Sequence, residues 1–234
     1  MSMHINKRAE SIVFSGIRQF ANQMIDYPDA VNLTVGQPDF PTPEAVKQAG
    51  IDAIRNNQTN YTHNAGVLEL RQAIQSFFKD SYGLSYRVED EIIVTNGASE
   101  GLDSVFRTIL EEGDEVILPA PTYSGYAPLV ELCGGKVVYL DTSESDFKPD
   151  PEALERLIND RTKAVLMNFP SNPTGITMTM EELSVLKEVF ERHELYIVTD
   201  EIYSESDLAV FSILANQAAL AIENAQFYDE VRKT

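Results

Sequence analysis

The sequence predicts an α/β protein with a mostly parallel sheet, helices on both of its faces and a long C-terminal amphipathic helix. Between residues 91 and 204, short apolar runs typical of strands alternate with stretches whose apolar spacing is helical. Repeated strand–helix units of this kind imply parallel strands, because each helix carries the chain back before the next strand begins. After residue 204 the pattern becomes one apolar stripe that recurs every three or four residues, which predicts the terminal helix.

The first 90 residues predict helices separated by loops. A short helix is expected around Ser11–Met24. The proline-rich run Gly36–Pro43 excludes a helix or a central strand, and Thr42 and Pro43 are expected as the N-cap and first residue of a helix that runs to about Asn56. After a loop, a second helix is predicted by apolar residues at helical spacing, which are Leu70, Ala73, Ile74, Phe77 and Phe78.

The strand–helix series begins near Glu91. Strands are expected at Ile92–Val94, Val116–Leu118, Val137–Leu140, Ala164–Met167 and Tyr196–Thr199. The helices between them carry recognisable start signals. Asp150 precedes Pro151 as an N-cap, and Thr179 with Glu182 has the spacing of a capping box.

Composition excludes several classes of function. A net charge of −19 argues against nucleic acid and anionic membranes as partners. The single cysteine, Cys133, cannot form an internal disulfide, so a reducing compartment is expected. No apolar run approaches the ~20 residues of a membrane helix, and the N-terminus has no signal-peptide core. We therefore expect a soluble, cytoplasmic protein.

Four polar loops follow predicted strands, at Asn96–Ser99, Pro121–Tyr123, Ser171–Gly175 and Asp200–Tyr203. Ligands of open α/β sheets bind at the carboxyl edge from which such loops leave. A small-residue turn at a helix N-terminus can hold a phosphate, and an aromatic ring can stack on a ligand ring. Taken singly, each loop could be only a helix start, a turn or part of the core. Together they predict a site for an aromatic, phosphorylated, electron-withdrawing ligand.

Six motifs in order carry a resemblance to a known family. They are Gly36–Phe40, Tyr61–Gly66, Thr95–Ser99, Pro121–Tyr123, Ser171–Gly175 and Asp200–Tyr203. Residues 1–204 resemble the N-terminal part of a class I/II aminotransferase, a fold-type I pyridoxal-phosphate enzyme, and are similar to bacterial aminotransferases of the aminotransferase A kind. The resemblance implies a transaminase acting on amino acids and 2-oxo acids. It divides the chain into an N-terminal arm (1–28) and a partial large domain (29–204).

The resemblance implies cofactor-binding roles for residues in three of the loops. The backbone amides of Gly97 and Ala98, with the hydroxyl of Ser99, would bind the phosphate of pyridoxal phosphate. Tyr123 would stack on the pyridine ring. Asn172 would hold the ring oxygen O3′.

The remaining implied roles fall at the fourth loop and near the N-terminus. Tyr203 would also hold O3′, and Asp200 would keep the pyridine nitrogen protonated, which makes the ring an electron sink. Gly36 would lie near the substrate carboxylate. Tyr61 would reach the cofactor phosphate of the neighbouring subunit, so a homodimer is expected.

The sequence departs from the family pattern after Asp200. The family's Schiff-base lysine lies in a Ser-Lys motif that is absent here, and Lys233 is the one lysine that follows Asp200. The arginine that grips the substrate carboxylate and the small domain are absent as well. We therefore expect a truncated transaminase with no catalytic residue, no activity as this chain, and weak or absent binding of pyridoxal phosphate.

Residues 205–234 resemble the last helix of a GAF sensory domain. The motifs that carry this resemblance lie at Asp207–Leu208, Leu214–Ala219, Ala221–Ala225 and Tyr228, inside the helix expected over Ser206–Val231. Two alternatives to a transaminase therefore stay open, a helix-mediated dimerisation module and a non-functional fusion.

The resemblance also has a consequence for the sheet. In the family, two further strands lie between the strand ending at Thr95 and the strand ending at Asn168. We therefore expect either new strand pairing at that gap or exposed sheet edges.

Overall fold

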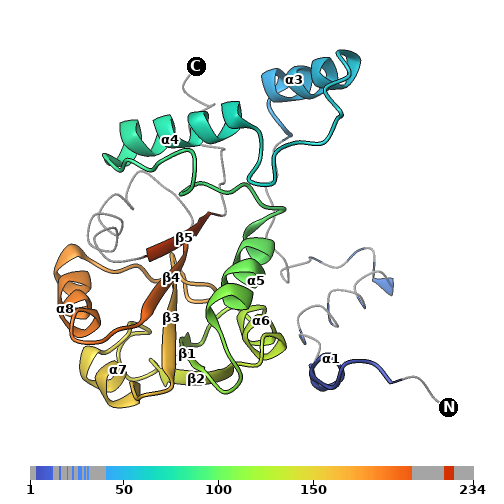
Figure 1. Cartoon of the computed structure of the whole chain (residues 1–234). Helices are drawn as coiled ribbons and strands as arrows, with labels where there is room; N and C mark the ends of the chain where they lie inside the picture. The colour runs from blue at the N-terminus through green and yellow to red at the C-terminus, as the bar shows by residue number, and fades with distance from the viewer. Residues whose placement is uncertain are drawn as a thin grey trace. The chain divides into compact units, whose positions relative to one another are not determined.

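The computed structural model describes residues 4–12, 16, 20, 23, 26–27, 29, 31, 41–201 and 219–223 (Figure 1). Residues 64–229 form the larger of two compact units, and the residues before them belong to the other. The larger unit holds the sheet and the helices that cover it. It is therefore the part of the chain that positions the predicted loops.

The sheet has five strands in the order β2-β1-β3-β4-β5, and every pair is parallel. The strands are β1 (Glu115–Ala120), β2 (Lys136–Asp141), β3 (Thr162–Phe169), β4 (Tyr196–Glu201) and β5 (Ala219–Glu223). Along β3, residues Ala164 to Met167 are all buried, as expected for a central strand covered on both faces. Four of the five strands predicted from the sequence are thereby confirmed.

Helices cover both faces of the sheet, as the sequence predicts (Figure 1). On one face, α5 (Ala98–Ile109) and α6 (Tyr126–Leu132) build a core in which Phe106 and Val130 are fully buried. On the other, α7 (Pro151–Leu157) and α8 (Met180–Phe190) contribute Leu154 and Leu183 to a second core. The α/β fold with a mostly parallel sheet is confirmed.

The predicted start signals are present at α7 and α8. The Asp150 carboxylate accepts a hydrogen bond from the Ala153 N–H at 2.7 Å, and Pro151 occupies the first turn. Thr179 and Glu182 exchange both bonds of a capping box, at 3.3 and 2.8 Å. These bonds satisfy amide donors that a helix start leaves unpaired, so the local sequence fixes where both helices begin.

The helix predicted around residues 70–78 is α4 (Leu68–Tyr82), which lies in the larger unit. Its Arg71 is buried, and the guanidinium donates to the carbonyls of Gly66, at 3.2 Å, and Val88. At the other end of α4, aromatic side chains pack edge to face, with ring centroids of Phe78 and Tyr86 at 5.4 Å. These contacts join α4 to the segment that leads into the predicted phosphate loop.

Boundaries in the smaller unit differ from those expected. The first helix, α1 (Lys7–Ser11), begins earlier than predicted, and of residues 12–24 the structure describes only 12, 16, 20 and 23, the last three helical. The helix α3 (Glu44–Arg55) is present, but its N-cap is Pro43 rather than Thr42. Neither end of α3 is fixed by a side-chain cap, which leaves the local sequence little control over its first residue.

The strand predicted at Ile92–Val94 is not part of the sheet. The Val94 N–H instead donates to the carbonyl of Ala65 at 3.1 Å, and Ile93 is 69% exposed. An apolar run becomes a strand only where another strand offers it a ladder, and the described strands pair with one another. Of the two outcomes expected beside the strand ending at Asn168, an exposed edge is not found, because that strand, β3, pairs with β1 and β4.

The continuous helix expected over Ser206–Val231 is wrong at residues 219–223, where the chain forms β5. This strand pairs with β4 from Ile197 to Glu201. The outer edge of β4 carries backbone groups that need partners, and a strand can supply ladder hydrogen bonds where a helix cannot. The other residues of the expected helix lie outside the described ranges.

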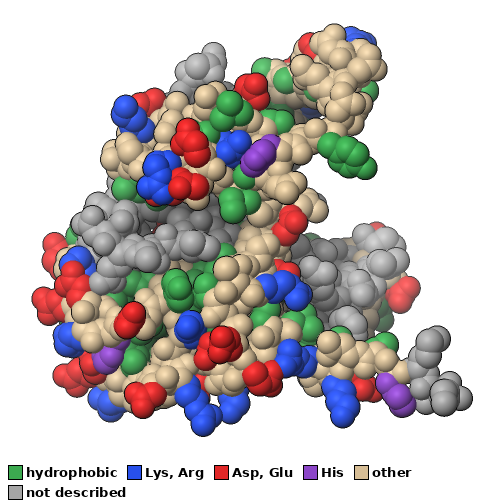
Figure 2. Space-filling model, viewed as in Figure 1, with side chains coloured by type: hydrophobic (Ala, Val, Ile, Leu, Met, Phe, Trp, Pro, Cys, Tyr) green, Lys and Arg blue, Asp and Glu red, His purple; other side chains and the backbone are tan. Residues whose placement is uncertain are grey.

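Acidic and basic side chains are interspersed over the surface of α7 and α8 (Figure 2). Glu155 of α7 accepts from Arg192 and lies 2.6 Å from the His193 ring nitrogen, just beyond α8. The Arg192 hydrogen bond, followed by that of His193, lowers the pKa of the Glu155 carboxyl. None of the helices that the structure describes has both the length and the apolar character of a membrane span.

The packing of α8 yields a matched test of the second core. Leu186 is 1% exposed, whereas its neighbour Val185 is 48% exposed on the same helix. We expect Leu186→Ala to lower the free energy of unfolding by about 2–5 kcal/mol, because it empties a packed site. Val185→Ala should change it by less than about 0.5 kcal/mol. Urea denaturation measures both, and equal effects would contradict this core.

Candidate functional site

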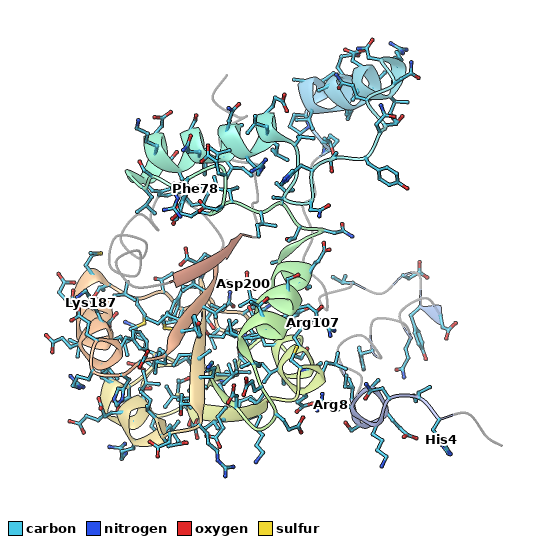
Figure 3. All side chains as sticks on the ribbon, in the orientation of Figure 1. His4, Arg8, Phe78, Arg107, Lys187 and Asp200 are labelled. Carbon is cyan, nitrogen blue, oxygen red and sulfur yellow. The ribbon has the colours of Figure 1, made fainter. Side chains whose placement is uncertain are left out.

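The carboxyl ends of β1, β3 and β4 lie at one edge of the sheet, because the three strands are parallel neighbours. In the β3–β4 ladder, Asn168 is the register partner of Asp200. Figure 3 shows Asp200 on β4, in the interior of the larger unit. The sheet therefore brings Asp200, the first residue of the fourth predicted motif, to the same carboxyl edge as the start of the third predicted loop.

Asp200 is a buried carboxylate, and one of its two oxygens has no hydrogen-bond donor in the described part of the chain. It is 8% exposed, and its Oδ2 accepts a hydrogen bond from the Tyr126 hydroxyl at 2.7 Å. Its Oδ1 is buried and accepts no hydrogen bond from the residues that the structure describes. Burial raises the pKa of Asp200, and the Tyr126 hydrogen bond opposes that rise. The arrangement leaves a lone pair that a further donor could use.

Tyr126 fixes this carboxylate from the helix layer on one face of the sheet. It is the first residue of α6 and is 2% exposed. Burial raises the pKa of the Tyr126 hydroxyl, and the negative charge and hydrogen bond of Asp200 raise it further, so the hydroxyl remains a donor. Its ring meets the ring of Tyr123 edge to face, with centroids 5.2 Å apart and planes at 79°. Tyr123, predicted to stack on a ligand ring, is 36% exposed.

The side-chain amide of Asn168 links the predicted Asn172 loop to Asp200. Its Nδ2 donates to the main-chain carbonyl of Asp200 at 2.7 Å. Its Oδ1 accepts from the main-chain N–H of Asn172 at 2.8 Å. The Asn172 side chain is exposed at the same sheet edge. A pocket beside these residues is lined by Pro119, Pro121, Thr122, Phe147, Pro149, Asn168, Phe169 and Ser171.

The predicted phosphate loop is the start of α5. Gly97 is the N-cap with φ of 85°, a left-handed conformation that side chains disfavour, and its N–H donates to the Thr95 carbonyl at 2.9 Å. Ala98 is buried in the same cluster as Tyr126, whereas Ser99 is exposed. The first amides of a helix lack intrahelical acceptors, so this turn can offer donors to an anion.

The structure therefore brings together most of the predicted site residues that it describes. Contacts join Tyr123, Asp200 and Asn172, and Ala98 shares a cluster with Tyr126. Tyr61 belongs to the smaller unit and is fully exposed. The two remaining residues, Gly36 and Tyr203, lie outside the described part of the chain.

Sequence reasoning missed two residues that organise this site, Tyr126 and Asn168. The helix α6 was not predicted, although Tyr126, Val130 and Cys133 recur at i, i+4 and i+7, a spacing that favours a helix. Asn168 sits at the end of a strand, and no local pattern distinguishes it from a turn residue. No group of three or more His, Cys, Asp or Glu side chains in the described ranges could hold a metal ion.

Comparison with known proteins decides the family. The model of aminotransferase class I and II matches residues 28–220, most of the chain. The chain belongs to the class I and II aminotransferases. The matched range passes Ser204, the end of the domain expected from the sequence, and reaches into β5. Members of this aminotransferase family use pyridoxal phosphate, in agreement with the cofactor expected from the sequence.

Individual aminotransferases are similar over about half of their own length. The probable N-acetyl-LL-diaminopimelate aminotransferase of Bacillus subtilis is 47% identical over 86% of this chain and 51% of the relative. The aspartate aminotransferase of the same organism is 42% identical over 76% of this chain and 45% of the relative. The solved aspartate aminotransferase of Thermus thermophilus with maleate superposes with a TM-score of 0.87 at 35% identity, covering 96% of this chain and 61% of that one.

The Tyr126–Asp200 contact predicts a pH-dependent loss of stability. Tyr126→Phe removes the donor to the buried carboxylate, so we expect the free energy of unfolding to fall by about 2 kcal/mol at about pH 8. The loss should shrink as pH falls through the raised pKa of Asp200, because the carboxyl is then neutral. Urea denaturation over a range of pH measures it, with exposed Tyr139→Phe as the control. A loss that does not depend on pH would contradict the role of this bond.

Proposed function

We propose that this chain provides the ring and phosphate side of a pyridoxal phosphate site, in an enzyme that transfers amino groups between amino acids and 2-oxo acids. The observation that carries the proposal is the buried Oδ1 of Asp200, which accepts no hydrogen bond from any residue that the structure describes. A half-satisfied carboxylate in an apolar setting is unfavourable, so its retention points to a partner that binds there. Family membership supports the same cofactor.

The carboxylate of Asp200 suits a protonated pyridine nitrogen. Tyr126 occupies Oδ2 and fixes the orientation of the carboxylate, which leaves Oδ1 for the ring N–H. A cation at this position would offset the burial that raises the pKa of Asp200 and would hold the carboxyl ionised. The residues that the structure describes therefore fit the cofactor at its ring nitrogen.

The other described residues fit the remaining parts of the cofactor. Tyr123 is partly exposed on the same cluster, and it would cover the pyridine ring. Ala98 and Ser99 lie at the start of α5, where free helix amides and a hydroxyl would bind the phosphate. Gly97 would contribute through its conformation, since its own N–H is already bonded to Thr95. Asn172 would hold the ring oxygen.

Bound pyridoxal phosphate supplies an electron sink that stabilises negative charge on the α-carbon of the amino acid. The residues of this chain would orient that ring and keep its nitrogen protonated. The roles of Gly36 at the substrate carboxylate, Tyr203 at the ring oxygen and Tyr61 across a homodimer interface are part of the same proposal. So is the inactivity of the 234-residue chain, because Lys233 is the one lysine after Asp200.

The proposal predicts opposite effects of Asp200→Asn on stability and on binding. The substitution removes a buried charge but keeps an acceptor for Tyr126, so the free energy of unfolding should rise by about 1 kcal/mol at about pH 8. Affinity for pyridoxamine 5′-phosphate should fall at least about tenfold, because the charged hydrogen bond to the ring nitrogen is lost. Urea denaturation and a fluorescence titration measure the two quantities. The ligand has no aldehyde, so surface lysines do not capture it.

The pH dependence gives this test a sign. The pKa of Asp200 is raised in the folded state, so its contribution to stability is fully present below the unfolded value of 3.8. That contribution is lost as pH rises through the folded pKa, and Asp200→Asn should remove this loss. Asp103→Asn, in an exposed pair with Arg107 on α5, is the control and should change neither quantity. Unchanged affinity in Asp200→Asn would contradict the proposed site.

The absent lysine gives a separate prediction. The 234-residue chain, supplied with pyridoxal phosphate, an amino acid and a 2-oxo acid, should show no amino transfer above the rate of free cofactor. Lys233→Ala should behave identically. The measurement is formation of the new amino acid by chromatography. Turnover that Lys233→Ala abolishes would overturn the proposed inactivity and assign Lys233 the anchoring role.

A further inference from the structure

Asn168 joins two loops that the proposed function uses separately. It is half-buried near the end of β3, opposite Asp200 in the ladder. One group of its amide donates to β4, and the other accepts from the loop that carries Asn172. Both bonds are short and both involve the main chain, at 2.7 and 2.8 Å. A side chain bonded in this way fixes two backbone segments relative to each other.

The loop that Asn168 holds is closed on itself by other bonds. The Ser171 N–H donates to the Ile176 carbonyl at 2.9 Å, and the Gly175 N–H donates to the Ser171 carbonyl at 2.6 Å. These two bonds set the shape of the loop but do not fix its place on the sheet. The bond from the Asn172 N–H to Asn168 does so, because Asn168 is itself part of the β3–β4 ladder.

The amide is the side chain that this position requires. The bond to the Asp200 carbonyl needs a donor, and the bond to the Asn172 N–H needs an acceptor. Both groups must lie at the end of the side chain of residue 168. Aspartate would supply only acceptors, and serine would supply one short hydroxyl for two separated partners. The two bonds therefore depend on both the chemistry and the length of asparagine.

We propose that Asn168 is a positioning residue that sets the separation between Asn172 and Asp200, so that one phosphorylated 3-hydroxypyridine ring meets both. The inference rests on the proposed function, since it needs Asn172 at the ring oxygen and Asp200 at the ring nitrogen. In this arrangement Asn168 itself would contact neither the ring nitrogen nor the ring oxygen, because its amide is bonded to the main chain of Asp200 and Asn172. Its effect on binding passes through Asn172, and this distinguishes it from a residue that merely stabilises the fold.

The test is a double-mutant cycle on the full chain, with pyridoxamine 5′-phosphate as the probe in a fluorescence titration. Asn168→Ala should weaken binding about tenfold, because the Asn172 loop loses its anchor. In an Asn172→Ala background the same substitution should weaken binding less than about threefold, since the group that it positions is gone. A loss that is equal in both backgrounds would overturn the proposal.

A control exists just before the same strand, which begins at Thr162. The amide of Asn159 donates to the Leu157 carbonyl at 3.2 Å and to the Glu115 carboxylate at 2.9 Å, and it accepts from the Arg161 N–H at 2.9 Å, so it also joins main-chain groups. Asn159→Ala should leave the affinity for pyridoxamine 5′-phosphate unchanged. If it weakens binding as much as Asn168→Ala, the effect is one of general stability and the inference is wrong.

Two further results keep the outcome decisive. If Asn168→Ala does not fold, as judged by circular dichroism and thermal melting, Asn168→Ser replaces it, with an expected loss of about threefold because one of the two bonds is lost. Affinity equal to that of the wild type would then overturn the inference. Failure of the wild-type chain to bind the probe would contradict the proposed function, whereas wild-type binding with unaffected Asn168 variants would contradict only the role of Asn168.

Discussion

The constraint on which this structure depends is the buried carboxylate of Asp200, which accepts a hydrogen bond from the hydroxyl of Tyr126. Asp200 lies buried near the carboxyl end of β4, and Tyr126 donates to its Oδ2 from a helix on one face of the sheet. Burial disfavours the charge, and a single hydrogen bond of about 1.5–3 kcal/mol does not restore what water would provide. The raised pKa of Asp200 records this imbalance. Within the described part of the chain, the fold thus holds a buried carboxylate oxygen that accepts no hydrogen bond, and a further donor could bind there.

The parallel sheet explains why this constraint can serve a ligand. Because β1, β3 and β4 run in the same direction, their carboxyl ends lie at one edge of the sheet. Finer placement then comes from side chains that cross between elements. Tyr126 crosses from α6 to β4, and Asn168 crosses from β3 to both β4 and the next loop. The sheet topology brings the strand ends to the same edge. The hydrogen bonds of Tyr126 and Asn168 then set the positions of the neighbouring groups more closely.

Local signals were predictable from the sequence, and non-local ones were not. The caps at Asp150 and Thr179 bond to groups three residues along the chain, so the local sequence is enough to fix the helix starts. By contrast, Ile92–Val94 reads as a strand but has no ladder partner in the described sheet. Residues 219–223 read as part of a helix but pair with β4. In both cases the state of the segment depends on which strand edge is available, and that is decided by residues far away in the chain.

The candidate site divides in the same way. Residues whose proposed roles belong to their own loop or strand end, such as Tyr123, Asn172 and Asp200, could be proposed from motifs, since the local sequence carries the chemistry. Tyr126 could not, because its partner is 74 residues away and its helix had not been recognised. Asn168 could not, because an asparagine near a strand end has many ordinary uses. Support for a functional residue is harder to see in a sequence than the residue itself, because it lies in pairings that only the fold creates.

Electrostatics shows how local geometry prevails over composition at the proposed phosphate position. The chain carries a net charge of −19, which on its own would repel a phosphate. Charges farther than about 8 Å are largely screened at physiological salt, whereas a helix start presents roughly half a positive charge and free amides in direct contact. The one acidic side chain in the first turn of α5, Glu100, accepts a hydrogen bond from the Asn96 N–H. The charge of Glu100 is thereby partly compensated within the turn. The amides at the start of α5 can still favour a bound anion against the repulsion from the net negative charge of the chain.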